Sequence, residues 1–143
     1  MSAANVEVVR RLYETLGEAT RKGELRDFSD TPVAAELLDP EVEWHGTVGG
    51  LAEGAVARGR DGIARFMYED SQEWEEVVFE PTEFVDVGDR VVVLQHERRR
   101  GRHSGLQIEA DTASVIWLRD GRVRRIQGYM EREQALHAVG LGR

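Results

Sequence analysis

Apolar residues recur every three or four positions in two stretches of the chain, and each stretch predicts an amphipathic helix. These helices are expected at residues 5–22 and 62–74. A shorter helix is expected at 32–38, where Pro32 suits a first turn because its missing amide hydrogen needs no partner. The apolar stripe of the first helix consists of Val6, Val9, Leu12, Tyr13, Leu16 and Ala19, and that of the longer later one of Ile63, Phe66, Met67 and Trp74.

The pattern changes to a period of two between residues 77 and 130, which predicts a run of strands. Gly-Asp and Asp-Gly pairs at 88–89 and 120–121 mark two of the turns, and the basic segment 98–103 marks the third. An earlier strand is expected at about 41–46, ahead of a glycine-rich loop. Most of the sheet should therefore be an antiparallel meander.

Helices followed by a meander, with a last short helix near 131–138, indicate the α+β class with helices packed on one face of the sheet. Residues 1–143 are expected to form a single domain, long enough to bury one core. The absence of cysteine excludes disulfides and thiolate sites. No secretion signal and no apolar run near the roughly 20 residues of a membrane span are present, so a cytoplasmic protein is expected.

The predicted strand 106–118 has two different faces. One face is nearly all apolar and should look toward the helices: Leu106, Ile108, Ala110, Thr112, Ser114, Ile116 and Leu118. The other face begins with charged residues and ends with apolar ones. An apolar patch on the outer face of a sheet favours a partner, so a homodimer is expected there. Its predicted contacts are Ala113, Val115, Trp117 and Tyr129.

Charge and motifs exclude several classes of function. The net charge of −8 opposes non-specific nucleic-acid binding, and we expect neither a nucleic-acid nor a membrane partner. The chain has no phosphate loop, dinucleotide fingerprint, nucleophile elbow or His-Glu-x-x-His motif. Its four histidines show no metal-ligand spacing, so the sequence predicts no metal and no cofactor. The arginines of 98–102 form either a solvated loop or an anion site.

The segment Leu37-Leu38-Asp39-Pro40-Glu41-Val42-Glu43-Trp44 ends a helix at a proline and at once starts a strand. After the glycine-rich loop comes Gly59-Arg60-Asp61-Gly62-Ile63, and the chain closes with the segment 129–136. In this order the segments resemble the NTF2-like (cystatin-like) superfamily, in particular its SnoaL-like branch. The resemblance implies a cone-shaped α+β fold, in which a curved, mostly antiparallel sheet wraps around N-terminal helices and encloses a pocket.

Steroid isomerases of this superfamily use a carboxylate base on the first strand, with an acid and a tyrosine as oxyanion donors. The resemblance places the base position on Trp44, the acid position on Ser114, and the tyrosine position near Leu12, beside Tyr13. Tryptophan cannot accept a proton, and serine is a poorer oxyanion donor than a neutral carboxylic acid. The isomerase mechanism is therefore not expected here.

A largely apolar pocket is expected instead, lined by Trp44, Phe66, Trp74, Phe79, Thr112, Ile116 and Met130. His96 lies mid-strand on the same face as Val92 and Leu94. If that face is concave, a desolvated imidazole with a lowered pKa would be the proton carrier, with Tyr13 or Ser114 as hydrogen-bond partner. The alternative is a hydrogen-bonded histidine without a chemical role.

Three functions remain open at this level. The first is the binding of a small apolar or aromatic molecule in the pocket. The second is a cofactor-independent lyase, isomerase or cyclase that acts through His96. The third is a protein-interaction module that uses the outer sheet face and has a filled core. A cavity that contains His96 would favour the second, whereas a chain without a cavity would favour the third.

Overall fold

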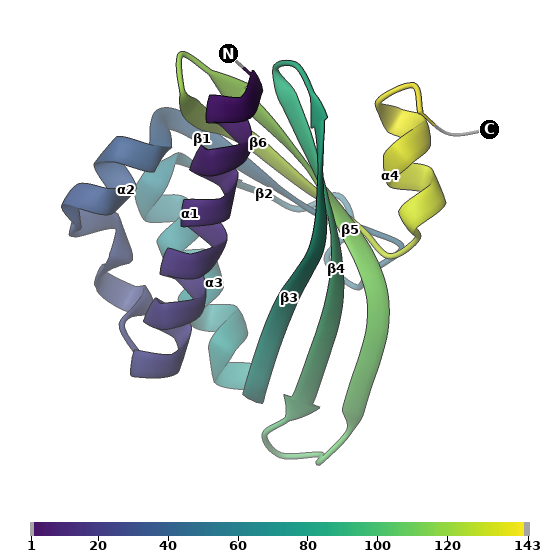
Figure 1. The fold of residues 1–143 in the computed structure, drawn as a ribbon. Coiled ribbons are helices and arrows are strands. Elements are labelled where there is room, and N and C mark those ends of the chain that lie inside the picture. The colour runs from purple at the N-terminus through teal and green to yellow at the C-terminus, as the bar shows by residue number, and fades with distance from the viewer. Residues whose placement is uncertain (1, 142–143) are drawn as a thin grey trace.

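The N-terminal half of the chain is mostly helical in the computed structural model, which describes residues 2–141. Helix α1 spans Ser2–Lys22, and a 3-10 helix, η1, follows at Leu25–Asp30. The short helix α2 spans Pro32–Leu37, and α3 spans Gly59–Glu73. Figure 1 shows α1, α2 and α3 together on one side of a curved sheet. This arrangement confirms the predicted α+β class.

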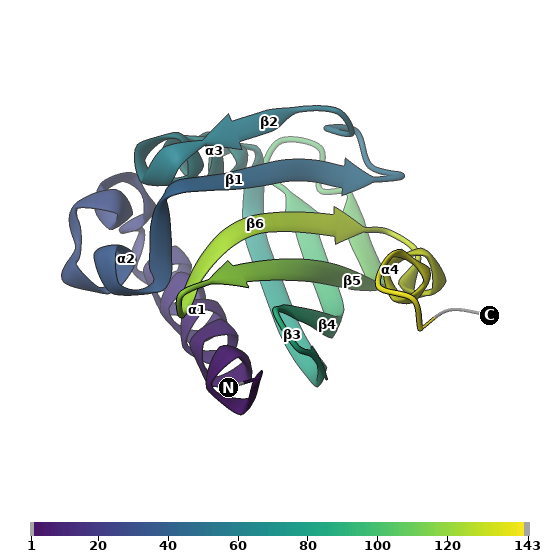
Figure 2. The same cartoon turned by 90° about the horizontal axis from the view of Figure 1, so that it is seen from above.

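The sheet has six strands in the order β2-β1-β6-β5-β4-β3. All neighbouring strands are antiparallel except β1 and β6, whose arrows point the same way in Figure 2. The sheet is therefore mixed and not closed, which the predicted meander did not include. The strands are β1 (Leu38–Val48), β2 (Val56–Arg58), β3 (Trp74–Val87), β4 (Arg90–Gly101), β5 (Gln107–Arg119) and β6 (Arg122–Tyr129).

The passage from α2 to β1 is set by local chemistry. The Thr31 hydroxyl oxygen accepts a hydrogen bond from the Ala34 amide at 3.2 Å, and Pro32 occupies the first turn. Leu38 is already extended, so the strand begins without a connecting loop. This places Leu37, Leu38 and Val42, all fully buried, at the junction of the helices with the sheet.

The main core fills the space between the helices and the inner face of the sheet. Alternation along β4 and β5 supplies its sheet side, because every second residue points to the same face. The buried residues of this core include Val9, Leu12, Phe28, Leu37, Leu38, Val42, Ile63, Val91, Val93, Ile116 and Val123.

A second, smaller core lies on the outer face of the sheet under helix α4 (Arg132–Ala138). Figure 1 shows α4 on the side of the sheet opposite α1. Ala135 and Val139 pack against Val92, Ala113 and Val115, and these three sheet residues are 0% exposed. The prediction that Ala113 and Val115 present an exposed surface to a second subunit is therefore wrong.

The other two predicted dimer contacts are half-buried. The Arg125 guanidinium lies 4.8 Å from the ring centroid of Trp117, and Tyr129 packs at the edge of the outer core. The apolar patch on the outer face is thus covered by the chain itself. A homodimer stays a prediction, without the exposed patch that motivated it.

The glycine-rich segment after β1 is a tight turn that leads into β2. The Gly46 amide donates to the Ala55 carbonyl at 2.8 Å, and a Cβ at position 46 would lie only 1.7 Å from the Ala52 carbonyl oxygen. Only glycine allows this close approach. The turn lets β2 pair with β1. Within residues 2–141, no helix combines the length and the apolar character that crossing a membrane requires.

Candidate functional site: a cavity between the helices and the sheet

A cavity of about 370 Å³ lies between the helices and the inner face of the sheet. Helices α1 and α3 and the 3-10 helix η1 contribute one side, and five of the strands contribute the other. Most of its lining is apolar. The apolar lining residues include Leu12, Leu16, Leu25, Phe28, Leu38, Trp44, Ile63, Phe66, Met67, Val77, Phe79, Ile116 and Ile126.

Two aromatic rings from distant segments form part of this wall. Trp44 of β1 stacks on Phe66 of α3, with ring centroids 4.0 Å apart and planes inclined by 28°. Trp44 points inward because it shares a strand face with the buried Val42, two residues earlier. Such a pair offers a flat apolar surface to a ligand.

A row of polar side chains crosses the cavity wall on β4 and β5. The Tyr13 hydroxyl donates to Oε1 of Gln95 at 2.7 Å. Nε2 of Gln95 donates to the Thr112 hydroxyl oxygen at 3.1 Å. The Thr112 hydroxyl in turn lies 3.4 Å from Oε1 of Glu97 and donates to it. These contacts join α1 to both strands and lead from buried groups to a carboxylate.

The row ends in an ionic cluster. Nε of Arg99 donates to Oε2 of Glu97 at 2.7 Å, and Nη1 of Arg99 donates to Oδ2 of Asp70 at 3.1 Å. The guanidinium also lies over the rings of Trp74 and Phe79, 5.2 and 5.3 Å from their centroids. The Glu97 side chain is only 13% exposed, so this carboxylate is shielded from water while one of its faces borders the cavity.

Tyr13 stays a neutral hydroxyl. Burial raises its pKa far above the usual value, and the nearby Glu97 charge also raises it. A hydrogen bond with Ser114 lowers the pKa of Tyr13, but by less than burial raises it. The cavity therefore contains an un-ionised phenol beside a carboxylate.

The structure brings most of the predicted pocket residues together. Trp44, Phe66, Phe79, Thr112 and Ile116 line the cavity, and so do Tyr13 and Ser114. The inward register predicted for Thr112 and Ser114 on β5 is thus correct. Trp74 and Met130 are not among the lining residues. Trp74, the first residue of β3, lies against Arg99. Met130 comes directly after β6, and its amide donates to the Val48 carbonyl at 3.0 Å.

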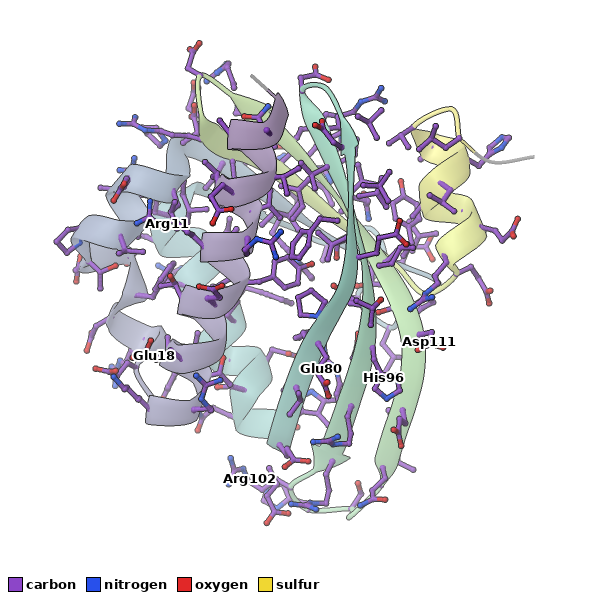
Figure 3. All side chains as sticks on the ribbon, viewed as in Figure 1. Arg11, Glu18, Glu80, His96, Arg102 and Asp111 are labelled. Atoms are coloured by element: carbon purple, nitrogen blue, oxygen red, sulfur yellow. The ribbon has the colours of Figure 1, made fainter. Side chains whose placement is uncertain are left out.

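His96 does not point into the cavity. It lies on the outer face of the sheet, where Nδ1 is 2.9 Å from Oδ1 of Asp111 and Nε2 is 2.8 Å from Oε1 of Glu109. Figure 3 shows His96 beside Asp111, away from α1. The hydrogen bonds to Asp111 and then Glu109 raise the pKa of His96. The predicted pocket position and the predicted lowering of the pKa are both wrong.

Strand pairing explains this error. His96 pairs with Asp111 and Gln95 pairs with Thr112, so each pair shares a face of the sheet. Since Thr112 points inward, Gln95 does too, followed by Glu97 and Arg99 at the period of two. These three residues were missed. No three His, Asp or Glu side chains within residues 2–141 are placed so that they could hold a metal ion.

Comparison with known families agrees with this architecture. Residues 9–126 match the family model of the SnoaL-like domain. This chain belongs to the SnoaL-like family. The match covers the elements that build the cavity, from α1 to β6. No curated protein matches this SnoaL-like chain significantly.

Solved structures share the fold at low sequence identity. An NTF2-like protein of unknown function from Burkholderia pseudomallei is 23% identical with a TM-score of 0.70, over 96% of this chain and 98% of its own. TerC, co-crystallised with polyporic acid, is 24% identical with a TM-score of 0.68, over 95% and 97%. A hypothetical protein with a ketosteroid isomerase-like fold from Catenulispora acidiphila, in complex with trimethylamine, is 15% identical with a TM-score of 0.60, over 81% and 88%. These likenesses establish the NTF2-like fold.

Proposed function

We propose that this SnoaL-like protein binds a small, largely apolar organic molecule in the cavity between the helices and the sheet. The cavity itself carries the proposal. Its volume of about 370 Å³ falls within the range of roughly 300–1,000 Å³ that is typical of small-molecule sites. A mainly apolar lining with a few convergent polar groups is also typical of such sites.

Two of the structural relatives support this reading. TerC was crystallised with polyporic acid, and the Catenulispora acidiphila protein with trimethylamine. Both are small organic molecules held by proteins of the same fold. At sequence identities of 24% and 15%, these relatives share the fold with the present chain, and their ligands do not identify its ligand.

Naphthalene is a suitable first probe, because it is flat, apolar and smaller than the cavity. Trp44 lines the cavity and Trp117 lies on the outer face. We therefore expect naphthalene to shift the NMR resonance of the Trp44 indole N–H and to leave the Trp117 resonance unchanged. No response of Trp44 at the solubility limit of naphthalene would contradict the proposal for flat aromatic ligands.

A blocking variant makes this test specific. Gly17 of α1 lines the cavity, and a Cβ there would meet only the Arg21 Nη1 atom, at 3.5 Å. Gly17→Leu should therefore fold and fill part of the space. Since overpacking costs about 1–3 kcal/mol, it should weaken naphthalene binding at least about fivefold. Glu14→Leu, on the exposed side of the same helix, is the matched control and should bind normally.

A cofactor-independent isomerase, lyase or cyclase is a second candidate, favoured by one observation. The shielded Glu97 carboxylate is a proton acceptor, and the neutral Tyr13 hydroxyl lies on the same polar row. The test is deuterium exchange into carbon positions of a bound carbonyl ligand in heavy water. Exchange that needs the protein and disappears in Glu97→Gln would support catalysis. Binding without exchange would leave the binding function alone.

A further inference from the structure

The hydrogen bonds along the polar row of the cavity all run in one direction. The Tyr13 hydroxyl donates to Gln95, the Gln95 amide donates to Thr112, and the Thr112 hydroxyl donates to Glu97. Nε of Arg99 donates to Glu97 from the other side. Each donor group of this row therefore already bonds a neighbouring side chain, and the row converges on a carboxylate, which in its ionised form can only accept.

Glu97 is able to accept further hydrogen bonds. An ionised carboxylate offers about four lone-pair positions on its two oxygens. Arg99 occupies one on Oε2, and Thr112 makes a long contact of 3.4 Å with Oε1. Oε1 is thus the under-used atom of a shielded carboxylate that lines the cavity. A shielded acceptor of this kind favours a ligand that donates a hydrogen bond to it.

The charges that line the cavity balance one another. Among the described residues, the charged lining side chains are two cations, Arg21 and Arg99, and two anions, Asp70 and Glu97. A ligand that brought its own charge would disturb this balance in a mostly apolar space, where an uncompensated charge is costly. The cavity therefore favours a neutral molecule.

We infer that Glu97 makes this cavity selective for a neutral aromatic molecule with a phenolic hydroxyl, which donates a hydrogen bond to Oε1 of Glu97. This inference rests on the proposed function and specifies the class of its ligand. The aromatic part would lie against the apolar lining, which includes the Trp44–Phe66 stack. The hydroxyl would lie at the polar row, where it joins the hydrogen bonds that end at Glu97.

A matched pair of probes separates selectivity from binding. 1-Naphthol and 1-methoxynaphthalene have the same ring system, but only the naphthol donates a hydrogen bond. At neutral pH, we expect 1-naphthol to bind the wild-type protein about tenfold or more tightly, as a hydrogen bond to a charged acceptor should provide. Isothermal titration or NMR titration measures both dissociation constants.

Glu97→Gln tests the assigned atom. Arg99 donates to Oε2 at 2.7 Å, so it should hold the amide oxygen of the new glutamine on that side and turn the NH₂ group toward Thr112 and the cavity. The acceptor then becomes a donor. The preference for 1-naphthol should disappear or reverse in favour of 1-methoxynaphthalene. Glu76→Gln is the matched control, because Glu76 pairs with Arg98 at 3.3 Å on the exposed surface, and it should leave the preference unchanged.

Each outcome is decisive. If both naphthalenes bind the wild-type protein equally, binding stands and the selectivity is overturned. If neither binds, the proposed function fails for this ligand class, and the inference fails with it. A tighter complex with 1-naphthylmethylamine than with 1-naphthol would overturn the assignment to neutral ligands. If Glu97→Gln keeps the full preference while circular dichroism shows a folded protein, Glu97 is not the selecting residue.

Discussion

Helix α4 covers the part of the outer sheet face where the sequence predicted a second subunit. One substitution tests how much this cover contributes to the free energy of unfolding. Ala135 is 0% exposed and packs against Val92, Ala113 and Val115. Ala135→Asp would place a carboxylate in this apolar contact. Because a desolvated and unpaired carboxylate costs several kcal/mol, the cheaper response is for α4 to leave the sheet.

The cost of undocking follows from what α4 contributes. Ala135 and Val139 are buried, and their side chains together remove four carbons from water. At about 0.8 kcal/mol per carbon, their burial stabilises the fold by roughly 3 kcal/mol. The hydrogen bond from Nη2 of Arg132 to the Gln95 carbonyl, at 3.3 Å, adds about 1 kcal/mol. Ala135→Asp should therefore lower the free energy of unfolding by ~3–4 kcal/mol.

Urea unfolding followed by circular dichroism measures this loss, with sedimentation to detect association through the uncovered face. Ala138→Asp is the control, since Ala138 is exposed on the same helix and should cost only a few tenths of a kcal/mol. A loss below about 1 kcal/mol for Ala135→Asp would show that α4 contributes little to the outer core. The packing argument would then be wrong.

Two further predictions concern the loop after β1 and the outer-face histidine. Gly46→Ala should unfold the β1–β2 turn and destabilise the protein by more than about 1 kcal/mol, because the new Cβ would overlap the Ala52 carbonyl. Urea unfolding measures the loss of stability, and amide exchange at Ala55 reports the opening of the turn. Unchanged protection of the Ala55 amide would contradict the prediction. His96→Gln should lose stability mainly at acidic pH. The carboxylates raise the pKa of His96, so protonated His96 stabilises the fold fully below about pH 6.5 and this contribution fades as the pH rises through the higher folded-state pKa. Urea unfolding at pH 5.5 and pH 9 compares wild type and variant, and an equal difference at both values would refute the linkage.

The sequence predicted the faces of β5 but not those of β4. Strand 106–118 contains enough residues of each kind to show that Thr112, Ser114 and Ile116 point inward. In β4, apolar residues at 91–94 are consecutive, and polar residues follow on both faces, so the alternation alone does not say which face is concave. If the inward face of β4 is assigned one residue out of register, His96 is placed in the cavity and Gln95 and Glu97 on the outer face.

Cross-strand pairing would have settled the choice. In an antiparallel pair, the numbers of paired residues have a constant sum, and here that sum is odd, as in 95 with 112. An inward residue of even number on β5 therefore requires an inward residue of odd number on β4. The length of the connecting hairpin determines this parity, and the sequence does not reveal that length unambiguously, because both glycines of the segment 101–105 are able to turn the chain.

The covering of the outer face and the short strand β2 were unpredictable for other reasons. The apolar residues Ala113 and Val115 required a cover, but a second subunit and a short helix of the same chain meet that requirement equally well. Strand β2 has three residues, too few for a periodic pattern, and its pairing depends on the close approach at Gly46.

The parallel pairing of β1 with β6 has a consequence for how the protein is made. Within residues 2–141, strand β1 lies between β2 and β6, so its one long neighbour is the strand of this sheet that comes last along the chain. A nascent chain that ends within β5 therefore carries β1 with no partner except the three residues of β2. Trp44 of β1 and Ile126 of β6 belong to the same cavity wall. The cavity thus closes only after the ribosome has released β6, and long-range contacts of this kind make folding slow.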